Sequence, residues 1–126
     1  MAIINPQQIV LTGIKALDSE RIALVNLVNT FYENVLKCRN FEEELSLTEQ
    51  FIGNFSRQME TYLDNEITYT QEIEPLPGRR QRQDALLQRL RAYSGQNLSY
   101  GSSFEVFQLA VKGLAPNIVF GSPEDN

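Results

Sequence analysis

The sequence predicts an all-α fold: a helical hairpin or small helix bundle with extended arms. Two neighbouring segments carry apolar residues at alternating spacings of three and four, which place side chains on one face of a helix. The first stripe is Leu24, Val28, Phe31, Val35 and Cys38. The second is Phe41, Leu45, Thr48, Ile52, Phe55, Met59 and Tyr62, in which only Thr48 interrupts the apolar pattern. Two such stripes in succession are typical of a hairpin whose seam is covered by further apolar surface.

Length and composition indicate a single helical domain over residues 1–126. The chain has 126 residues, of which 42% are hydrophobic, as in an ordinary globular domain. We expect an extended linker at about 65–78 and a C-terminal arm at about 115–126. Neither a secretory leader nor an apolar stretch near the ~20 residues of a membrane-spanning helix is recognisable, so we expect no membrane contact. The expected location is the cytoplasm or a particle made inside the cell.

The N-terminal segment carries the signals of a helix start. Asn5 can act as an N-cap, Pro6 suits the first helical position, and Gln8 is placed to complete a capping box. We therefore expect a short helix, and its apolar face would be formed by Ile9, Val10, Ile14 and Leu17.

The two helices of the hairpin are expected at about 20–37 and 41–63. Asp18 or Ser19 can cap the first helix. Asn40, followed three residues later by a glutamate, can cap the second. One long helical rod through both segments is the alternative. The capping residue in the middle favours a break, and therefore the hairpin.

The pattern changes after the second stripe. Apolar and polar residues alternate between Ile67 and Ile73, which is the period of a strand or an extended arm. The sequence Pro-Leu-Pro-Gly at 75–78 excludes a helix and marks a linker.

Two further helices are expected in the C-terminal part. A basic helix at about 79–93 would place on one side the residues Leu86, Leu87, Leu90 and Tyr93. A capping box of Ser102 and Glu105 would open a helix that runs to about 112. The buried side of that helix would be formed by Phe104, Phe107, Val111 and Leu114.

The residue types argue against catalysis and against a metal or cofactor site. The sequence has no histidine, the commonest general base and a frequent metal ligand. Cys38 ends an apolar stripe and is interpreted as a buried small apolar residue, not as a nucleophile. The three glutamates at 42–44 are consecutive and fan around a helix, and the acidic residues at 64–66 lack the glycine and the ligand spacing of a calcium loop. We expect no enzyme activity, no cofactor and no metal.

The charges are unevenly distributed, although the net charge is −5. Acidic residues dominate 42–74, whereas five of the eleven cationic residues lie in one short stretch, Arg79, Arg80, Arg82, Arg89 and Arg91. This stretch is the solvated face of an amphipathic helix, a site for an acidic protein surface, or a site for nucleic acid. The chain's own acidic region, in the same or a neighbouring copy, could be the acidic surface. The net negative charge disfavours nucleic acid.

These features predict a non-enzymatic structural or adaptor subunit of a larger multi-copy protein assembly. The expected partners are further copies of the chain or other subunits. The residues expected to contact them are Arg79, Arg80, Arg82, Arg89, Ile67, Tyr69, Ile73, Ile118, Val119 and Phe120. The apolar arms would pack either on neighbouring chains or back across the hairpin. The alternative function is a small regulatory module that binds an acidic partner or nucleic acid through the basic helix. In its general build, without a shared motif, the chain resembles small helical connector or adaptor subunits of virus particles.

Overall fold

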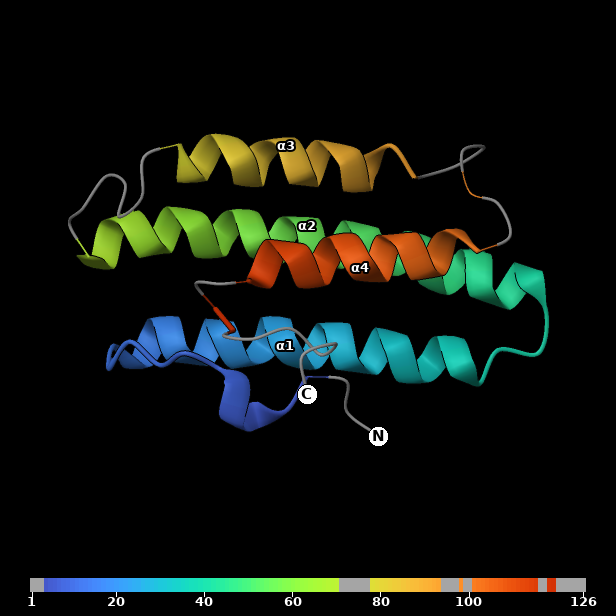
Figure 1. Cartoon of the computed structure of the whole chain (residues 1–126), viewed down its shortest axis with the longest axis horizontal. Coiled ribbons are helices and arrows are strands. Elements are labelled where there is room, and N and C mark those ends of the chain that lie inside the picture. The colour runs from blue at the N-terminus through green and yellow to red at the C-terminus, as the bar shows by residue number, and fades with distance from the viewer. Residues whose placement is uncertain (1–3, 71–77, 94–97, 99–100, 116–117, 120–126) are drawn as a thin grey trace.

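The protein is all-α, as a computed structural model of the chain shows (Figure 1). The structure describes residues 4–70, 78–93, 98, 101–115 and 118–119, without the side chains of Thr70 and Arg79. Within these ranges a short 3₁₀ turn, η1, and four α-helices are present: η1 (Pro6–Gln8), α1 (Lys15–Leu36), α2 (Phe41–Thr70), α3 (Arg79–Arg91) and α4 (Ser102–Leu114). None of the described helices has the length and apolar content needed to cross a membrane.

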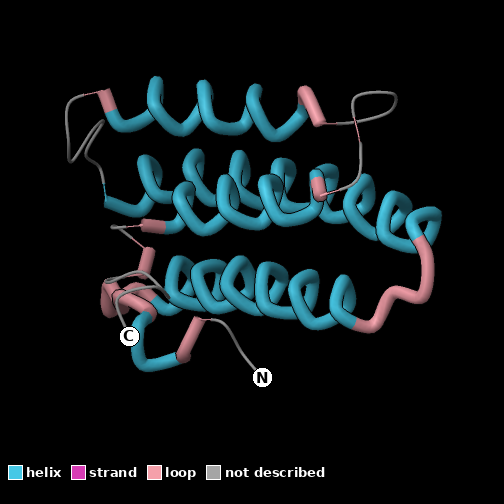
Figure 2. Tube along the Cα trace, turned by 45° about the vertical axis from the view of Figure 1, so that its right-hand side comes forward, coloured by secondary structure: helices cyan, strands magenta, loops and turns pink. Residues whose placement is uncertain are grey.

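The helices pack with α2 and α4 between α1 and α3. The helices α1 and α2 form the predicted hairpin and turn at residues 37–40, so the alternative of one long rod is wrong (Figure 1). The shorter helix α4 packs against both of them, and α3 packs against α2 and α4 (Figure 2). One contiguous hydrophobic core lies between the four helices.

Most of the second sequence stripe lies in that core. Thr48, Ile52, Phe55, Met59 and Tyr62 are all at most 4% exposed. The first three residues of the first stripe, Leu24, Val28 and Phe31, are buried too. Phe31 stacks on Phe51 of α2 with ring centroids 4.1 Å apart. The stripes lose burial only at the turn of the hairpin, where Phe41 is 40% exposed.

The N-terminal segment forms only a short turn in place of the helix expected to start at Asn5 and Pro6. The capping box of Asn5 and Gln8 is present, but it closes only the turn η1. The chain then runs extended to Gly13, whose φ of 86° is a left-handed conformation that ends any helix. Helix α1 begins at Lys15, before the predicted position. Asp18 does not cap it, and its carboxylate instead accepts hydrogen bonds from the N–H groups of Thr12 (2.7 Å) and Gly13 (3.1 Å).

Helix α2 is longer than the sequence pattern indicated. Asn40 caps it as expected, since its Oδ1 accepts the N–H of Glu43 at 2.9 Å. The predicted strand or arm from Ile67 is wrong up to Thr70, because this segment is the last turn of α2. Ile67 lies one turn after the buried Leu63, so the helical period continues there. The alternation over residues 67–70 is too short to distinguish the two-residue period of a strand from the 3.6-residue period of a helix. The remainder of the expected linker, 71–77, lies outside the described residues.

Helix α3 agrees with the prediction, whereas α4 presents a different face from the expected one. Its buried residues are Ser102, Ser103, Val106, Leu109, Ala110, Gly113 and Leu114. Phe104 is instead 53% exposed, and the expected cap at Ser102 is wrong because Gly101 precedes the helix without a side-chain cap. The helix rotates this way because Gly113 meets α3 closely. A Cβ at Gly113 would lie 3.2 Å from Cδ2 of Leu86.

The two ends of the described chain meet beside α1. Ile118 and Val119 are buried, and Val119 forms an isolated antiparallel bridge with Ile9. The N–H of Val10 donates to the carbonyl oxygen of Ile118 at 2.8 Å. This part of the C-terminal arm therefore folds back on its own chain, the second of the two alternatives that the sequence left open.

The seam of the hairpin supports a stability prediction at Phe55. Its side chain is fully buried in the middle of α2. Phe55→Ala should lower the free energy of unfolding by about 3–5 kcal/mol, the usual cost of such a truncation. Urea denaturation measures the change, with Gln58→Ala on the exposed side of α2 as the control. Equal effects of the two substitutions would contradict the packing described here.

Asp18 makes stability depend on pH in the acid range. The hydrogen bonds from Thr12 and Gly13 and the charge of Arg21 hold the pKa of Asp18 below its usual value. Because the pKa is lowered in the folded state, the stabilisation is present above pH ~4 and is lost as the pH falls through the folded-state pKa. Asp18→Asn should be less stable than the wild type at pH 7. Urea titrations should show that difference shrinking below pH ~4, and a constant difference down to pH 2 would rule out this role.

Candidate functional site

The predicted basic stretch is partly neutralised by acidic residues of the same chain. Arg80 pairs through Nη1 with Asp64 of α2 at 2.8 Å and through Nε with Asp84 of its own helix at 3.2 Å. Arg91, at the other end of α3, pairs with Glu60 of α2. These pairs fix α3 on α2. The acidic region of the same chain, one of the partners considered from the sequence, is therefore a partner of this helix.

Three of the described arginines of α3 are exposed: Arg82, Arg89 and Arg91. Arg82 and Arg89 lie on one side of the helix, two turns apart, and Arg91 pairs with Glu60. The side chain of Arg79 lies outside the described residues. The stretch therefore presents a narrower cationic surface than the sequence count of arginines suggested.

The apolar candidates from the arms are divided between core and surface. Ile118 and Val119 are core residues, so their side chains are not available to a partner in this conformation. Ile67 is half-buried on α2, and Tyr69 is exposed near its end. Ile73 and Phe120 lie outside the described residues.

Cys38 lies in the hairpin turn and is half-buried. Its Sγ donates to the carbonyl oxygen of Asn34 at 3.4 Å. Burial raises the pKa of the Cys38 thiol, and the negative charges of Glu43 and Glu44 raise it further. A thiol with a raised pKa is a poor nucleophile at neutral pH. Within the described part of the chain, no three cysteine or carboxylate side chains converge on a common metal position.

An exposed apolar surface of the described residues lies where α1 ends and α4 begins. We call this surface the tip face, and it consists of Leu36, Phe104, Tyr32, Val35 and Phe107. Leu36 is 62% exposed and Phe104 is 53% exposed, while the other three are half-buried. Sequence reasoning placed Phe104 in the core and did not single out Leu36. The periodicity of α4 alone could not have corrected this, because its apolar residues occupy more than one face.

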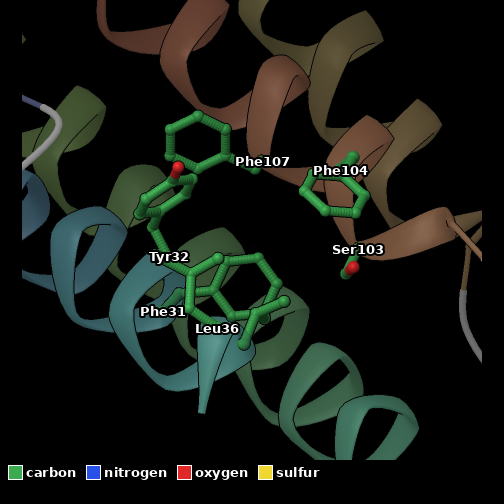
Figure 3. Close-up of a pocket in the computed structure, with 7 residues that line it drawn as sticks. Phe31, Tyr32, Leu36, Ser103, Phe104 and Phe107 are labelled. Atoms are coloured by element: carbon green, nitrogen blue, oxygen red, sulfur yellow. The ribbon is translucent and has the colours of Figure 1, made fainter. Parts of the chain in front are cut away.

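The tip face encloses a shallow dent. Figure 3 shows the rings of Tyr32 and Phe107 side by side, with centroids 5.1 Å apart, and Leu36 and Phe104 at the edges. The dent holds about 10 Å³, roughly the space of one water molecule. Ser103 also lines the dent, and its hydroxyl is buried without a hydrogen-bond partner among the described residues. A dent of this size accepts part of a side chain, so the tip face suits a protein surface better than a small molecule.

The length of the helices explains why this surface is open. Helix α4 has 13 residues and α2 has 30, or about 20 Å against about 45 Å at 1.5 Å per residue. The shorter helix cannot cover the whole hairpin. Apolar side chains next to its first turn therefore remain in contact with water.

A second cluster, which sequence reasoning missed, is a buried ionic network between α1 and α2. Nε of Arg21 donates to the hydroxyl of Tyr62 at 2.6 Å, and that hydroxyl donates to Oε2 of Glu66 at 2.8 Å. Nη2 of Arg21 lies 3.5 Å from the same carboxylate oxygen. Arg21 and Glu66 are 6% exposed and Tyr62 is fully buried. A buried group of ionisable side chains can mark an active site. Here the three groups bond one another and link the helices, which indicates a structural role.

Arg21 also holds the N-terminal segment. Its Nη1 donates to the carbonyl oxygen of Val10 at 2.5 Å. The same guanidinium therefore joins α1, α2 and the extended chain before α1. In the sequence, Arg21 is recognisable only as a cation four residues after Leu17 and three before Leu24, on the apolar side of α1.

No protein-family model, curated protein or solved structure matches this chain.

Breaking the buried network should destabilise the fold strongly. Arg21→Met leaves the carboxylate of Glu66 buried beside Tyr62 without its counter-charge, and such losses cost about 3–5 kcal/mol. The double variant Arg21→Met/Glu66→Met removes both charges and should recover part of that loss. Urea unfolding measures both, with Arg57→Met on the exposed side of α2 as the control. If the single variant is as stable as this control, the network contributes nothing to the fold.

Proposed function

We propose that this chain is a non-enzymatic structural or adaptor subunit of a larger multi-copy protein assembly. The observation that carries the proposal is the tip face. In the described part of the chain, Leu36 and Phe104 are exposed to water at neighbouring positions and border three half-buried apolar side chains. Contiguous apolar surface of this kind is costly in isolation and is characteristic of protein–protein contacts.

The hydroxyl of Ser103, which has no hydrogen-bond partner among the described residues, supports the same interpretation. A buried polar atom without a partner costs free energy. A partner that covers the tip face could relieve that cost by placing a polar group in the dent. The unpaired hydroxyl thus lies where a partner would be most useful.

The alternative, an acidic or nucleic-acid partner on the basic helix, has less support. Arg80 and Arg91 are engaged by Asp64 and Glu60 of the same chain. Among the described side chains of α3, Arg82 and Arg89 are the exposed arginines outside these two ion-paired residues. With a net charge of −5, two such groups offer little attraction for a polyanion.

The test is affinity purification from the native source followed by identification of the bound proteins. The wild type should co-purify with defined partners in a complex much heavier than one chain, as measured by size exclusion with light scattering. Leu36→Glu should remove these partners, because a charge on the tip face cannot be buried without compensation. The resemblance to connector subunits of virus particles names one class of assembly that this experiment could identify.

A matched control lies on the same helix. Ile22 is also an exposed aliphatic residue of α1, at 42%, but it lies 14 positions or about 21 Å from Leu36. Ile22→Glu should leave the complex intact. A wild-type monomer that binds nothing would overturn the proposed function. Equal loss of partners in both variants would remove the tip face as its basis.

A further inference from the structure

The N-terminal segment occupies a binding site built on α1. We call residues 4–12 the N-terminal arm, and Figures 1 and 2 both show it beside α1. The side chain of Ile4 is fully buried and belongs to the hydrophobic core. The side chain of Asn29 binds the backbone of the same residue twice. Its Oδ1 accepts the Ile4 N–H at 2.9 Å, and its Nδ2 donates to the Ile4 carbonyl oxygen at 3.0 Å.

The pairing at Asn29 has the form of peptide recognition. A single amide satisfies both backbone groups of one residue, as a neighbouring strand would, and an adjacent pocket selects its side chain. Asn29 is itself 9% exposed and sits in the middle of α1, where an unpaired amide would be costly. The side-chain amide of Asn29 is therefore paired by the backbone of the N-terminal arm at Ile4.

The other end of the arm is held through its backbone as well. Val10 donates its N–H to Ile118 and accepts from Arg21, and Ile9 pairs with Val119. These contacts recognise an extended chain with an apolar anchor, and none of them depends on the covalent link to α1.

That link is exposed. Leu11 is 63% exposed, Thr12 and Gly13 are exposed as well, and a Cβ on Gly13 would meet nothing within 4 Å. This exposed joint, residues 11–13, is held by hydrogen bonds from Thr12 and Gly13 to the carboxylate of Asp18, and it contributes no side chain to the core. An identical arm from a second copy could therefore make the same anchoring contacts, and only the exposed joint would change its course. Exchange of an identical element is a low-cost route to association between copies.

We propose that the Ile4 site on α1 is a binding site for the N-terminal arm in trans, and that neighbouring copies exchange arms in the assembly. The site takes a peptide with a β-branched apolar anchor at Ile4, a 3₁₀ turn at Pro6–Gln8 and an extended segment after that turn. This inference rests on the proposed function, since it requires several copies in contact. The link between neighbouring copies is then the N-terminal arm and not the tip face.

The first test is peptide binding to the full chain with its own anchor removed. In Ile4→Ser the arm loses its buried side chain while Asn29 stays in place. A synthetic peptide of residues 1–12 should bind this variant saturably and raise its melting temperature. The same peptide carrying Ile4→Ser should bind at least tenfold more weakly, because burial of an isoleucine accounts for that factor or more. If Ile4→Ser does not fold, Ile4→Ala, which keeps one methyl group, replaces it.

The second test is complementation between full-length copies. Ile4→Ser has a defective arm and an intact site, while Asn29→Ala has an intact arm and a defective site. Mixed together, they should form a species of higher mass by light scattering that neither variant forms alone. Absence of both peptide binding and complementation would overturn arm exchange. If native partners still co-purify in that case, the proposed function stands without it, so the two failures are distinguishable.

Discussion

The apolar seam of α2 is the constraint on which the other elements depend. This helix contacts α1, α3 and α4, and its stripe from Thr48 to Tyr62 is almost fully buried. A long helix with one continuous apolar face must be covered along its length, and the hairpin covers only part of it. The two short helices α3 and α4 complete the cover over the middle. They do not reach the turn of the hairpin, and the apolar side chains of the tip face are therefore exposed there.

Polar groups in this core act as joints between segments. Arg21 joins α1, α2 and the N-terminal arm, and Asn29 fixes the arm at Ile4. Gln83 of α3 donates to the carbonyl oxygen of Gly113 at 3.1 Å and ties α3 to the end of α4. Each bond lies between segments that are distant in sequence. Because buried polar groups need specific partners, such bonds favour one arrangement of the helices over others of similar apolar area.

Much of the charge of α3 is neutralised by acidic residues of the same chain. The acidic second half of α2 receives Arg80 and Arg91, so much of the opposed charge seen in the sequence is used within the chain. Exposed ion pairs contribute little to stability, and their effect here is to orient α3. The contacts that we propose for partners are therefore the apolar tip face and the N-terminal arm.

The sequence by itself determined the helical class, the hairpin, the caps at Asn5 and Asn40, and the basic helix, which was expected at about 79–93 and is observed at 79–91. These features depend on local periodicity and on side chains that bond their own backbone, which are readable from neighbouring residues. Only the tertiary structure decided the rotation of α4, because the approach of Gly113 to Leu86 is a contact between helices. It also decided the continuation of α2 through Ile67, the burial of Ile118 and Val119, and the network of Arg21. Each of these depends on which distant segment lies alongside, and local patterns carry no information about such pairings.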